Sequence, residues 1–317
     1  MSKLPVLVLT YNRPDLTEGL MEKIAAYAPE RLYVACDGAN ASKAGDSDLV
    51  EATRVHLVAP SWKTELHTRF HSENQGLRQA VEGAISWFFD NELEGIILED
   101  DCHPTPGFFR LAEHVLDRYR DNETIWGMTG SNNAGVTFPD GASYGFIRHP
   151  LIWGWASWAD RWRKNDSDLD SYLENRNTIG PGGWPSKEHK FAFQRHLDSM
   201  VRWSRPNSWD YRWAWTVMSQ EGLWIVPNQH LVENKGFRHD ATHTTSQFFK
   251  PPSLGQLSAV IPPGQITANV VEETKVLNRL FFLKAPLALN YAVNFGKRVK
   301  SRLFLRKTKV TTWLENR

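Results

Sequence analysis

The 317-residue sequence predicts an α/β fold, with a mostly parallel central sheet flanked by helices and a helical extension at its C-terminal end. Two observations predict this class. Short apolar runs alternate with segments whose apolar residues recur every three or four positions, the spacing of a helix that buries one face. Hydrophobic residues make up 41% of the chain, enough to fill the large core that such a fold requires.

Five apolar runs in the first half are the expected strands. They span 5–10, 31–38, 65–71, 95–101 and 124–130. Helical periodicity lies between them, most clearly where Leu77, Val81, Ile85 and Phe88 share one face of a helix that opens at Gly76. Because strands and helices alternate, we expect parallel strands in a doubly wound sheet.

Large aromatic side chains dominate the second half. The chain has 14 tryptophans, most of them between Trp126 and Trp224, and such rings fill cores or provide flat surfaces for sugars. We expect an irregular aromatic segment over 144–164, a loop over 177–187, helices over 187–203 and 208–222, and a strand over 223–227. The chain is accordingly divided into 1–130, 131–265 and a basic helical extension over 266–317.

Composition also limits the partners and the compartment. A formal net charge of only +1 gives no reason to expect nucleic acid as a partner. Cys36 and Cys102 are too few for a disulfide framework and suit a reducing compartment. The N-terminal apolar run is too short for a signal peptide, and no window approaches the ~18 apolar residues of a spanning helix. We therefore expect a cytoplasmic protein.

Polar residues follow four successive strands at the point where each ends. They are Asn12 with Arg13, Asp37, Asn74, and the triplet Glu99 to Asp101. Any one of them fits a turn or a helix cap. In open α/β sheets, however, ligands bind beyond the carboxyl ends of the strands, so four polar exits together favour a binding site at this edge.

Of these four strand ends, the one with the most ionisable side chains is the acidic triplet Glu99, Asp100 and Asp101. Like charges held close together repel, so one acid must be protonated or a cation must neutralise the group. Hard oxygen ligands suit Mg²⁺ or Mn²⁺, which commonly link a diphosphate to one or two protein carboxylates. A solvated acidic surface turn is the alternative; the preceding strand and the following helix favour the metal and diphosphate site.

Four segments in this order resemble the nucleotide-sugar-binding half of glycosyltransferases with the GT-A fold: "LVLTYNRPD", "ACDG", "NQGLRQAV" and "ILEDDC". The triplet resembles their DxD-type metal motif in the Glu-Asp-Asp form of the N-acetylglucosaminyltransferase I family. "PGFF", "GWASWADRW", "SWDYRW" and "DATHTTSQFF" extend the similarity, also to bacterial HlpA-like proteins. The resemblance covers roughly Pro5 to Phe249 and implies a Rossmann-like GT-A fold. The resemblance further implies that residues 1–130 bind the nucleotide sugar and that residues 131–265 hold the acceptor and the catalytic group.

The resemblance also implies roles for residues at the strand exits. Arg13 matches an arginine near the donor nucleotide, and Asp37 matches the acid that contacts the base or ribose of uridine. Asp101 matches the direct metal ligand. The remaining donor-binding matches are Thr10 and Tyr11 in the first motif, Asn74 and Arg78 along the donor pocket, and Glu99 and Asp100 around the ribose and the water shell of the metal. Arg78 either reaches the phosphates or is a solvated helix arginine.

Two further residues are candidates for chemistry in the second half. Transfer with inversion needs a general base, and Asp210 in "NSWDYRW" lies among tryptophans that could raise its pKa. The family has its catalytic Asp in a similar Trp-Asp setting, although capping of the following helix is the alternative role. His243 matches a late histidine that touches the metal or the diphosphate in the family, or is a surface histidine without a role.

These residues favour a metal-dependent hexosyltransferase that uses Mn²⁺ or Mg²⁺. The donor would be a nucleoside diphosphate sugar, a UDP-sugar in particular, and the acceptor a hydroxyl of a glycan or lipid-linked molecule. A sugar-phosphate nucleotidyltransferase is a second reading, but the first strand exit "LTYNRPDL" lacks the Gly-rich loop with a basic residue that those enzymes need. A catalytically degenerate GT-A-like binding protein is the third.

The C-terminal segment combines positive charge with large apolar residues. Between Arg279 and Lys309 there are nine Lys or Arg residues and no Asp or Glu. This pattern is typical of a helix that lies on an anionic membrane surface, here the inner face. A helix that packs on the core and exposes its basic face is the alternative. Unchanged binding to anionic vesicles after removal of this segment would exclude the membrane role.

Overall fold

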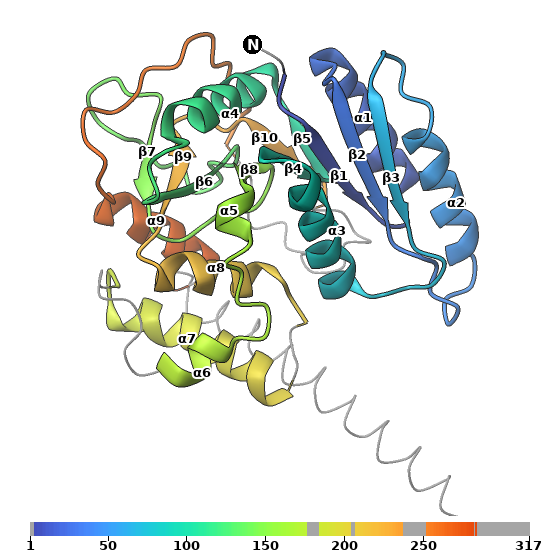
Figure 1. Cartoon of the computed structure of the whole chain (residues 1–317). Coiled ribbons are helices and arrows are strands. Elements are labelled where there is room, and N and C mark those ends of the chain that lie inside the picture. The colour runs from blue at the N-terminus through green and yellow to red at the C-terminus, as the bar shows by residue number, and fades with distance from the viewer. Residues whose placement is uncertain (1–2, 176–183, 204–206, 237–251, 282, 284–317) are drawn as a thin grey trace, which may run out of the picture.

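The computed structural model describes residues 3–175, 184–203, 207–236, 252–281 and 283, and they form a mixed eight-stranded sheet flanked by helices (Figure 1). The strand order is β3-β2-β1-β4-β8-β6-β9-β7. The strands are β1 (Val6–Thr10), β2 (Arg31–Cys36), β3 (Glu65–Phe70), β4 (Glu94–Glu99), β6 (Ile125–Thr129), β7 (Tyr144–Ile147), β8 (Trp155–Trp158) and β9 (Leu223–Pro227). A separate antiparallel pair joins β5 (Cys102–Pro104) to β10 (Val232–Asn234).

The sheet is mostly parallel, as the sequence predicts. β3, β2, β1 and β4 all run in the same direction. β8 is antiparallel to both of its neighbours, β4 and β6, and β7 is antiparallel to β9. Because β6 pairs in parallel with β9, six of the eight strands end at one edge of the sheet. That edge collects the polar strand exits.

Helices cover both faces of the sheet (Figure 1). They are α1 (Pro14–Tyr27), α2 (Asp46–Leu57), α3 (Leu77–Asn91), α4 (Pro106–Tyr119), α5 (Ala159–Trp162), α6 (Asp170–Asn175), α7 (Lys187–Trp203), α8 (Asp210–Ser219) and α9 (Val270–Phe281). Val6 and Val8 of β1 pack in the core under α1, α2 and α4, whereas Leu7 and Leu9 pack in the core under α3, α5 and α8. This alternation follows from the two-residue period of a strand. A third apolar cluster joins α6, α7, α8 and α9.

Gly76 shows why the start of α3 could be predicted. It precedes the first helical residue with φ of +80°, a backbone conformation that residues with a Cβ rarely adopt. The predicted helix face is also correct, since Val81, Ile85 and Phe88 are buried. Leu77 is the exception, because at the first turn it remains 42% exposed.

The segment 144–164, predicted to be irregular, instead forms β7, β8 and α5. All four residues of β8, Trp155 to Trp158, are buried. A strand that is covered on both faces shows no apolar and polar alternation, so the usual strand signal is absent from its sequence. β8 also lies between β4 and β6 and runs antiparallel to both. The alternation of strands and helices in the sequence does not predict a strand at this position.

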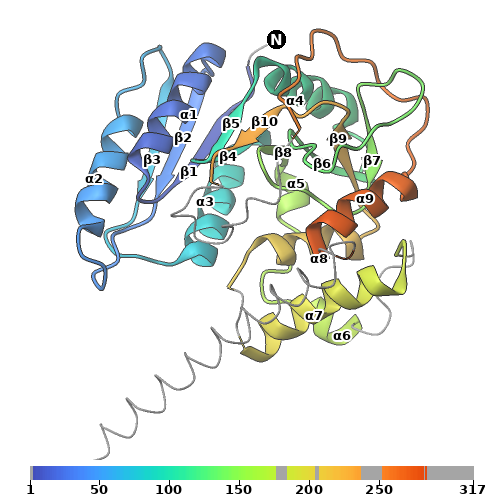
Figure 2. The ribbon, with the colours of Figure 1, turned by 180° about the vertical axis from the view of Figure 1, so that it is seen from behind.

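α9 attaches the start of the predicted C-terminal extension to the core. The carboxylate of Glu273 accepts a hydrogen bond from the backbone N–H of Arg148 (2.9 Å) and pairs with the Arg148 guanidinium (3.0 Å). Figure 2 shows α9 beside α7 and near the β7 edge. Residues 284–317 lie outside the described residues. Within the described part of the chain, no helix is long and apolar enough to cross a membrane.

His149 supplies a pH-dependent test of this packing. Its ring is buried, contacts the rings of Phe193 and Phe281 edge-on, and donates from Nδ1 to the carbonyl of Pro150 (2.9 Å). Burial lowers its pKa from 6.5 to about 4. The unfolded chain therefore binds more protons below pH 6.5, and the free energy of unfolding falls as the pH falls from 6.5 towards 4.

Between pH 7.5 and pH 5 we expect His149 to remove about 2 kcal/mol of stability, from a pKa shift worth about 1.4 kcal/mol per unit. His149→Gln keeps a donor but does not titrate, so it should lose this part of the pH dependence. Urea unfolding of both proteins at the two pH values measures the difference. Equal changes in the two proteins would contradict the burial of a neutral imidazole.

Candidate functional site

The candidate site lies where β1 and β4 end side by side. Leu9 of β1 pairs with Glu99 of β4, and the N–H of Asp100 donates to the Leu9 carbonyl (3.0 Å). Arg13 follows β1 at the start of α1, and Asp101 follows β4. Because the two strands are parallel neighbours, residues that follow them in sequence meet at the same edge. Residues 87 positions apart in the chain are thus brought into contact.

Arg13 forms a fork with two acids of the triplet. Its Nε donates to Asp100 Oδ2 (3.2 Å) and its Nη1 to Asp101 Oδ2 (3.0 Å), while Nη2 pairs closely with the second oxygen of Asp100. Asp100 is 1% exposed. Burial raises the pKa of Asp100 to about 7, although the charge of Arg13 acts to lower it. One guanidinium therefore opposes three carboxyl groups, and the cluster retains an excess of acid.

Among the described residues, Oδ1 of Asp210 is buried without a hydrogen-bond partner, and Oδ1 of Asp100 has only its ion pair with Arg13. Glu99 makes no hydrogen bond or ion pair within the described residues. Burial, then Asp101 and Asp100, raise the pKa of Glu99 well above its usual range, and Asp210 adds to the rise. The charge of Asp210 thus acts on Glu99, although 111 residues separate the two in the sequence.

Asp210 does not cap α8. Trp209 occupies the position before the helix, and no side chain makes a capping hydrogen bond there. The indole of Trp209 stacks on that of Trp155 in β8 (5.9 Å between ring centres, 28° between planes). Burial raises the pKa of Asp210 to about 6. The buried tryptophans therefore position the start of α8, and the carboxyl group of Asp210 remains available for another role.

The end of β10 lies directly against Asp101. The N–H of Lys235 donates to the Asp101 carbonyl (2.8 Å), and the next residue is Gly236. A Cβ at Gly236 would lie 2.4 Å from Asp101 Oδ2, so only glycine fits there without displacing that carboxylate. The predicted metal ligand His243 lies outside the described residues, in a segment that begins immediately after Gly236.

Asp37 organises a loop with both of its carboxylate oxygens. Oδ1 accepts from the N–H groups of Gly38 (2.8 Å) and Gln75 (2.9 Å), and Oδ2 accepts from the N–H of Gly76 (3.1 Å) and the amide of Asn74 (3.0 Å). A carboxylate has about four acceptor positions, so the protein itself occupies them. The structure brings Asp37 and Asn74 together, as predicted for neighbouring strand exits. The hydrogen bonds of Asp37 connect the end of β2 to the start of α3.

Asp46 has a similar organising role, which the sequence analysis missed. It accepts from the side-chain amide of Asn12 (2.6 Å), the backbone N–H of Asn40 (2.7 Å) and the hydroxyl of Tyr11. Thr10 is held through its hydroxyl by the carbonyl of Ala35 (3.0 Å). Asp46 begins α2 within a polar loop, where its sequence context differs little from that of an ordinary helix start.

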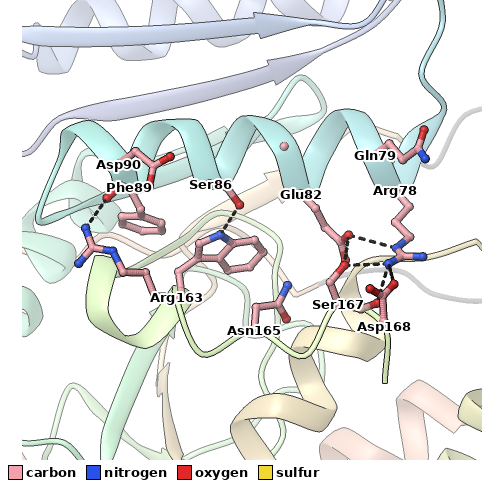
Figure 3. A pocket seen from close by; sticks show the side chains of 12 residues that line it. Arg78, Gln79, Glu82, Ser86, Phe89, Asp90, Arg163, Asn165, Ser167 and Asp168 are labelled. Atoms are coloured by element: carbon pink, nitrogen blue, oxygen red, sulfur yellow. Dashed lines mark hydrogen bonds and ion pairs between the residues drawn. The ribbon is translucent and has the colours of Figure 1, made fainter. Parts of the chain in front are cut away.

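Arg78 is held by protein groups beside α3 and is not a freely solvated helix arginine. Its guanidinium binds Glu82 (3.1 Å), the hydroxyl of Ser167 (2.8 Å) and Asp168 (2.7 Å), as Figure 3 shows. These contacts line a polar groove of about 530 Å³ between α3 and the segment after α5. The carbonyl of Ser167 also accepts from Arg212, two residues after Asp210. Arg78 thus ties α3 to α8.

The oxygen ligands at the site fit a divalent ion only in part. Among the described residues, no group of three or more His, Cys, Asp or Glu residues is arranged to hold a metal ion. Glu99 and Asp101 offer carboxylates at the edge of the cluster. Mg²⁺ is often held by one or two carboxylates, with substrate phosphates and water completing its shell. The donors present therefore suit an ion that arrives with a diphosphate rather than one that is permanently enclosed.

Comparison with known proteins gives no family. No protein-family model and no curated protein matches the chain. Solved structures that match do so only weakly, as three of them illustrate. They are a 4-diphosphocytidyl-2C-methyl-D-erythritol synthase from Anaerococcus prevotii (7% identity, 54% of this chain and 77% of the other, TM-score 0.31), an apo UDP-glucose pyrophosphorylase (10%, 74% and 92%, 0.34) and a glycosyltransferase involved in glycosylation of the major capsid of PBCV-1 (10%, 70% and 92%, 0.24). Scores this low carry no argument for a family or an activity.

Replacement of Asp37 by Asn tests its organising role. In the Asp37→Asn variant, an NH₂ group would replace one of the two carboxylate oxygens. In either orientation this NH₂ group would face N–H donors, which would then lack an acceptor. We expect Asp37→Asn to lower the free energy of unfolding by about 1–3 kcal/mol. Denaturant unfolding measures the loss, with Asp117→Asn on the exposed side of α4 as the control. A variant as stable as the control would contradict the four-bond arrangement.

Proposed function

We propose that the chain is a glycosyltransferase that moves a sugar from a nucleoside diphosphate sugar to an acceptor hydroxyl with inversion, using Mn²⁺ or Mg²⁺. The observation that carries this proposal is the acidic triplet at the carboxyl edge of the sheet, which Arg13 binds through Asp100 and Asp101 and in which the charge of Asp210 acts on Glu99. Two of the acids, Glu99 and Asp210, come from different halves of the chain and have carboxyl oxygens without protein partners. Such oxygens are available to a substrate or its cation.

The excess negative charge of the cluster sets the donor chemistry. A diphosphate alone would be repelled by Asp101 and Asp210, and within the described residues Arg13 is the cation that pairs with the triplet. A divalent ion held by Asp101 and Glu99, with His243 as a further proposed ligand, would neutralise these acids and act as a Lewis acid on the leaving diphosphate. Arg13 orients Asp101, and Asp100 holds Arg13 in place. We favour a UDP-sugar, and the Asp37 loop forms one wall of the nucleotide site.

Asp210 is the proposed general base. With a pKa of about 6 it is ionised at neutral pH and can take a proton from an acceptor hydroxyl. As the proton moves to the carboxylate, the acceptor oxygen bonds to the anomeric carbon. The bond from that carbon to the diphosphate oxygen breaks, and its electron pair leaves with the diphosphate. Since only ionised Asp210 accepts the proton, kcat/KM should rise with pH through about 6.

A panel of nucleotide sugars with Mn²⁺, scored for nucleoside diphosphate release, tests the proposal. We expect Asp210→Asn to lower kcat about 100-fold or more while nucleotide binding persists, because it removes the base and keeps the shape. Asp101→Ala should weaken both nucleotide binding and turnover. Asp117→Asn is the matched control.

Two results would overturn this function. One is that no donor binds or turns over, or that Asp101→Ala behaves as the control. The other is pyrophosphate release from a nucleoside triphosphate and a sugar phosphate, which would assign the site to nucleotidyl transfer instead.

A further inference from the structure

The polar groove between α3 and the segment 162–168 is a second candidate site (Figure 3). None of the residues that line it belongs to the acidic triplet, and neither Arg13 nor Asp210 does so. Its volume of about 530 Å³ lies within the range of about 300–1,000 Å³ that is usual for small-molecule sites. From Arg78 to Asp90, α3 rises by about 18 Å along the groove. These dimensions suit an extended ligand.

Direct contacts between the two walls hold the groove in shape. The indole N–H of Trp162 donates to the hydroxyl of Ser86 (3.0 Å), and Arg78 donates to the hydroxyl of Ser167 (2.8 Å). Figure 3 shows these contacts at two separate points along α3. The groove is therefore built without a ligand, and a ligand that enters it does not have to order its walls.

Gly83 lines the groove from the middle of α3. Glycine destabilises a helix interior relative to alanine, and here neither the backbone nor the packing requires it. Its φ is not positive, and the atom nearest to a Cβ placed there is Nη2 of Arg69 at 3.8 Å, an ordinary contact. What the missing side chain does leave is space on the wall of the groove, between Gln79 and Ser86.

Neutral hydrogen-bonding groups surround this space. The NH₂ group of Asn165 makes no hydrogen bond within the described residues, and in Figure 3 the amide points towards α3, between Ser86 and Glu82. Ser86 and Gln79 add a hydroxyl and an amide at exposed positions. Hydroxyl and amide groups both donate and accept, which matches the hydroxyl groups of a sugar.

The charges of the lining disfavour a charged ligand. Arg78 already pairs with Glu82 (3.1 Å) and Asp168 (2.7 Å). Together with Asp90, three acids stand against Arg78 and Arg163, so a phosphate would be repelled. Because two of these acids already bind Arg78, a polyamine would gain little. The two aromatic side chains of the lining are buried, so an apolar ligand would find little surface. A neutral, polyhydroxylated ligand fits best.

We propose that this groove binds a neutral oligosaccharide, whose hydroxyl groups bond to Asn165, Ser86 and Gln79 and whose rings lie over Gly83. The protein then holds a glycan at a place other than the acidic triplet. The inference goes beyond the proposed function and does not depend on it, because binding in the groove requires neither a donor sugar nor a metal ion.

An array of neutral oligosaccharides, probed with the fluorescently labelled full chain, tests the proposal. Wild-type protein should bind at least one glycan of the array without added nucleotide or metal. Gly83→Leu fills the space on α3 and should weaken this binding about tenfold or more, because the new side chain clashes with the ligand. Asn165→Ala removes one hydrogen bond and should weaken it about fivefold.

Matched controls separate the groove from the rest of the protein. Ala52→Leu and Gln265→Ala make the same kinds of change at exposed positions that do not line the groove, and both should bind as the wild type. Asp210→Asn should also bind as the wild type. Thermal unfolding shows that each variant is folded, and Gly83→Leu should be at least as stable as the wild type because leucine is a better helix former.

A local probe keeps the test decisive. The indole N–H of Trp162 bonds to Ser86 on the wall of the groove, so its NMR signal, assigned with Trp162→Phe, should shift when the bound glycan is added. No glycan bound on the array, undiminished binding by Gly83→Leu, or an unchanged Trp162 signal would overturn the proposal. Loss of binding in Asp210→Asn alone would assign the glycan to the transfer site. A shift of the Trp162 signal by inorganic phosphate or spermidine, but not by the glycan, would assign the groove to an ion. Each of these two assignments overturns the proposal as well.

Discussion

The repulsion among Glu99, Asp100 and Asp101 is the constraint on which the site depends. A strand that ends in three acids is tolerable only because the neighbouring parallel strand ends in Arg13, whose fork pairs with two of them. Arg13 offsets part of the negative charge of the triplet, but it forms no ion pair with Glu99. Burial of Asp100 raises its pKa, and the guanidinium of Arg13 acts against that rise, so the arginine lowers the cost of placing these acids together.

The carboxylates near this edge divide into two kinds. The carboxylate oxygens of Asp37 and Asp46 accept hydrogen bonds from backbone and side-chain donors, and these bonds hold the loops after β1 and β2. Glu99 and Asp210 have oxygens that no described protein group uses. Both kinds have the same chemistry in the sequence, a carboxyl group beside a strand or helix end. Their roles differ because only the folded chain decides how many N–H donors point at each one.

Buried tryptophans in the second half of the chain position the start of α8, where Asp210 lies. Trp155, in a strand that runs antiparallel to its neighbours, stacks on Trp209, the residue that precedes α8. Arg212 in the first turn of α8 shares the carbonyl of Ser167 with Arg78 on α3. α8 is thus held from two sides. The position of Asp210 follows from these contacts and does not require a helix cap.

The sequence by itself determined the class of fold, most of the helices and strands, and the placement of Arg13 and the acidic triplet at one edge of the sheet. Periodicity reports which face of an element is buried, and parallel neighbours bring their ends to one edge, so local patterns suffice for these features. Tertiary structure alone decided that 144–164 forms strands, that Asp37 is saturated, and that Arg78 binds Ser167. A strand buried on both faces has no alternating pattern, and the partners of a charged side chain depend on contacts between residues up to 90 positions apart, as between Arg78 and Asp168. Such contacts leave no trace in local sequence.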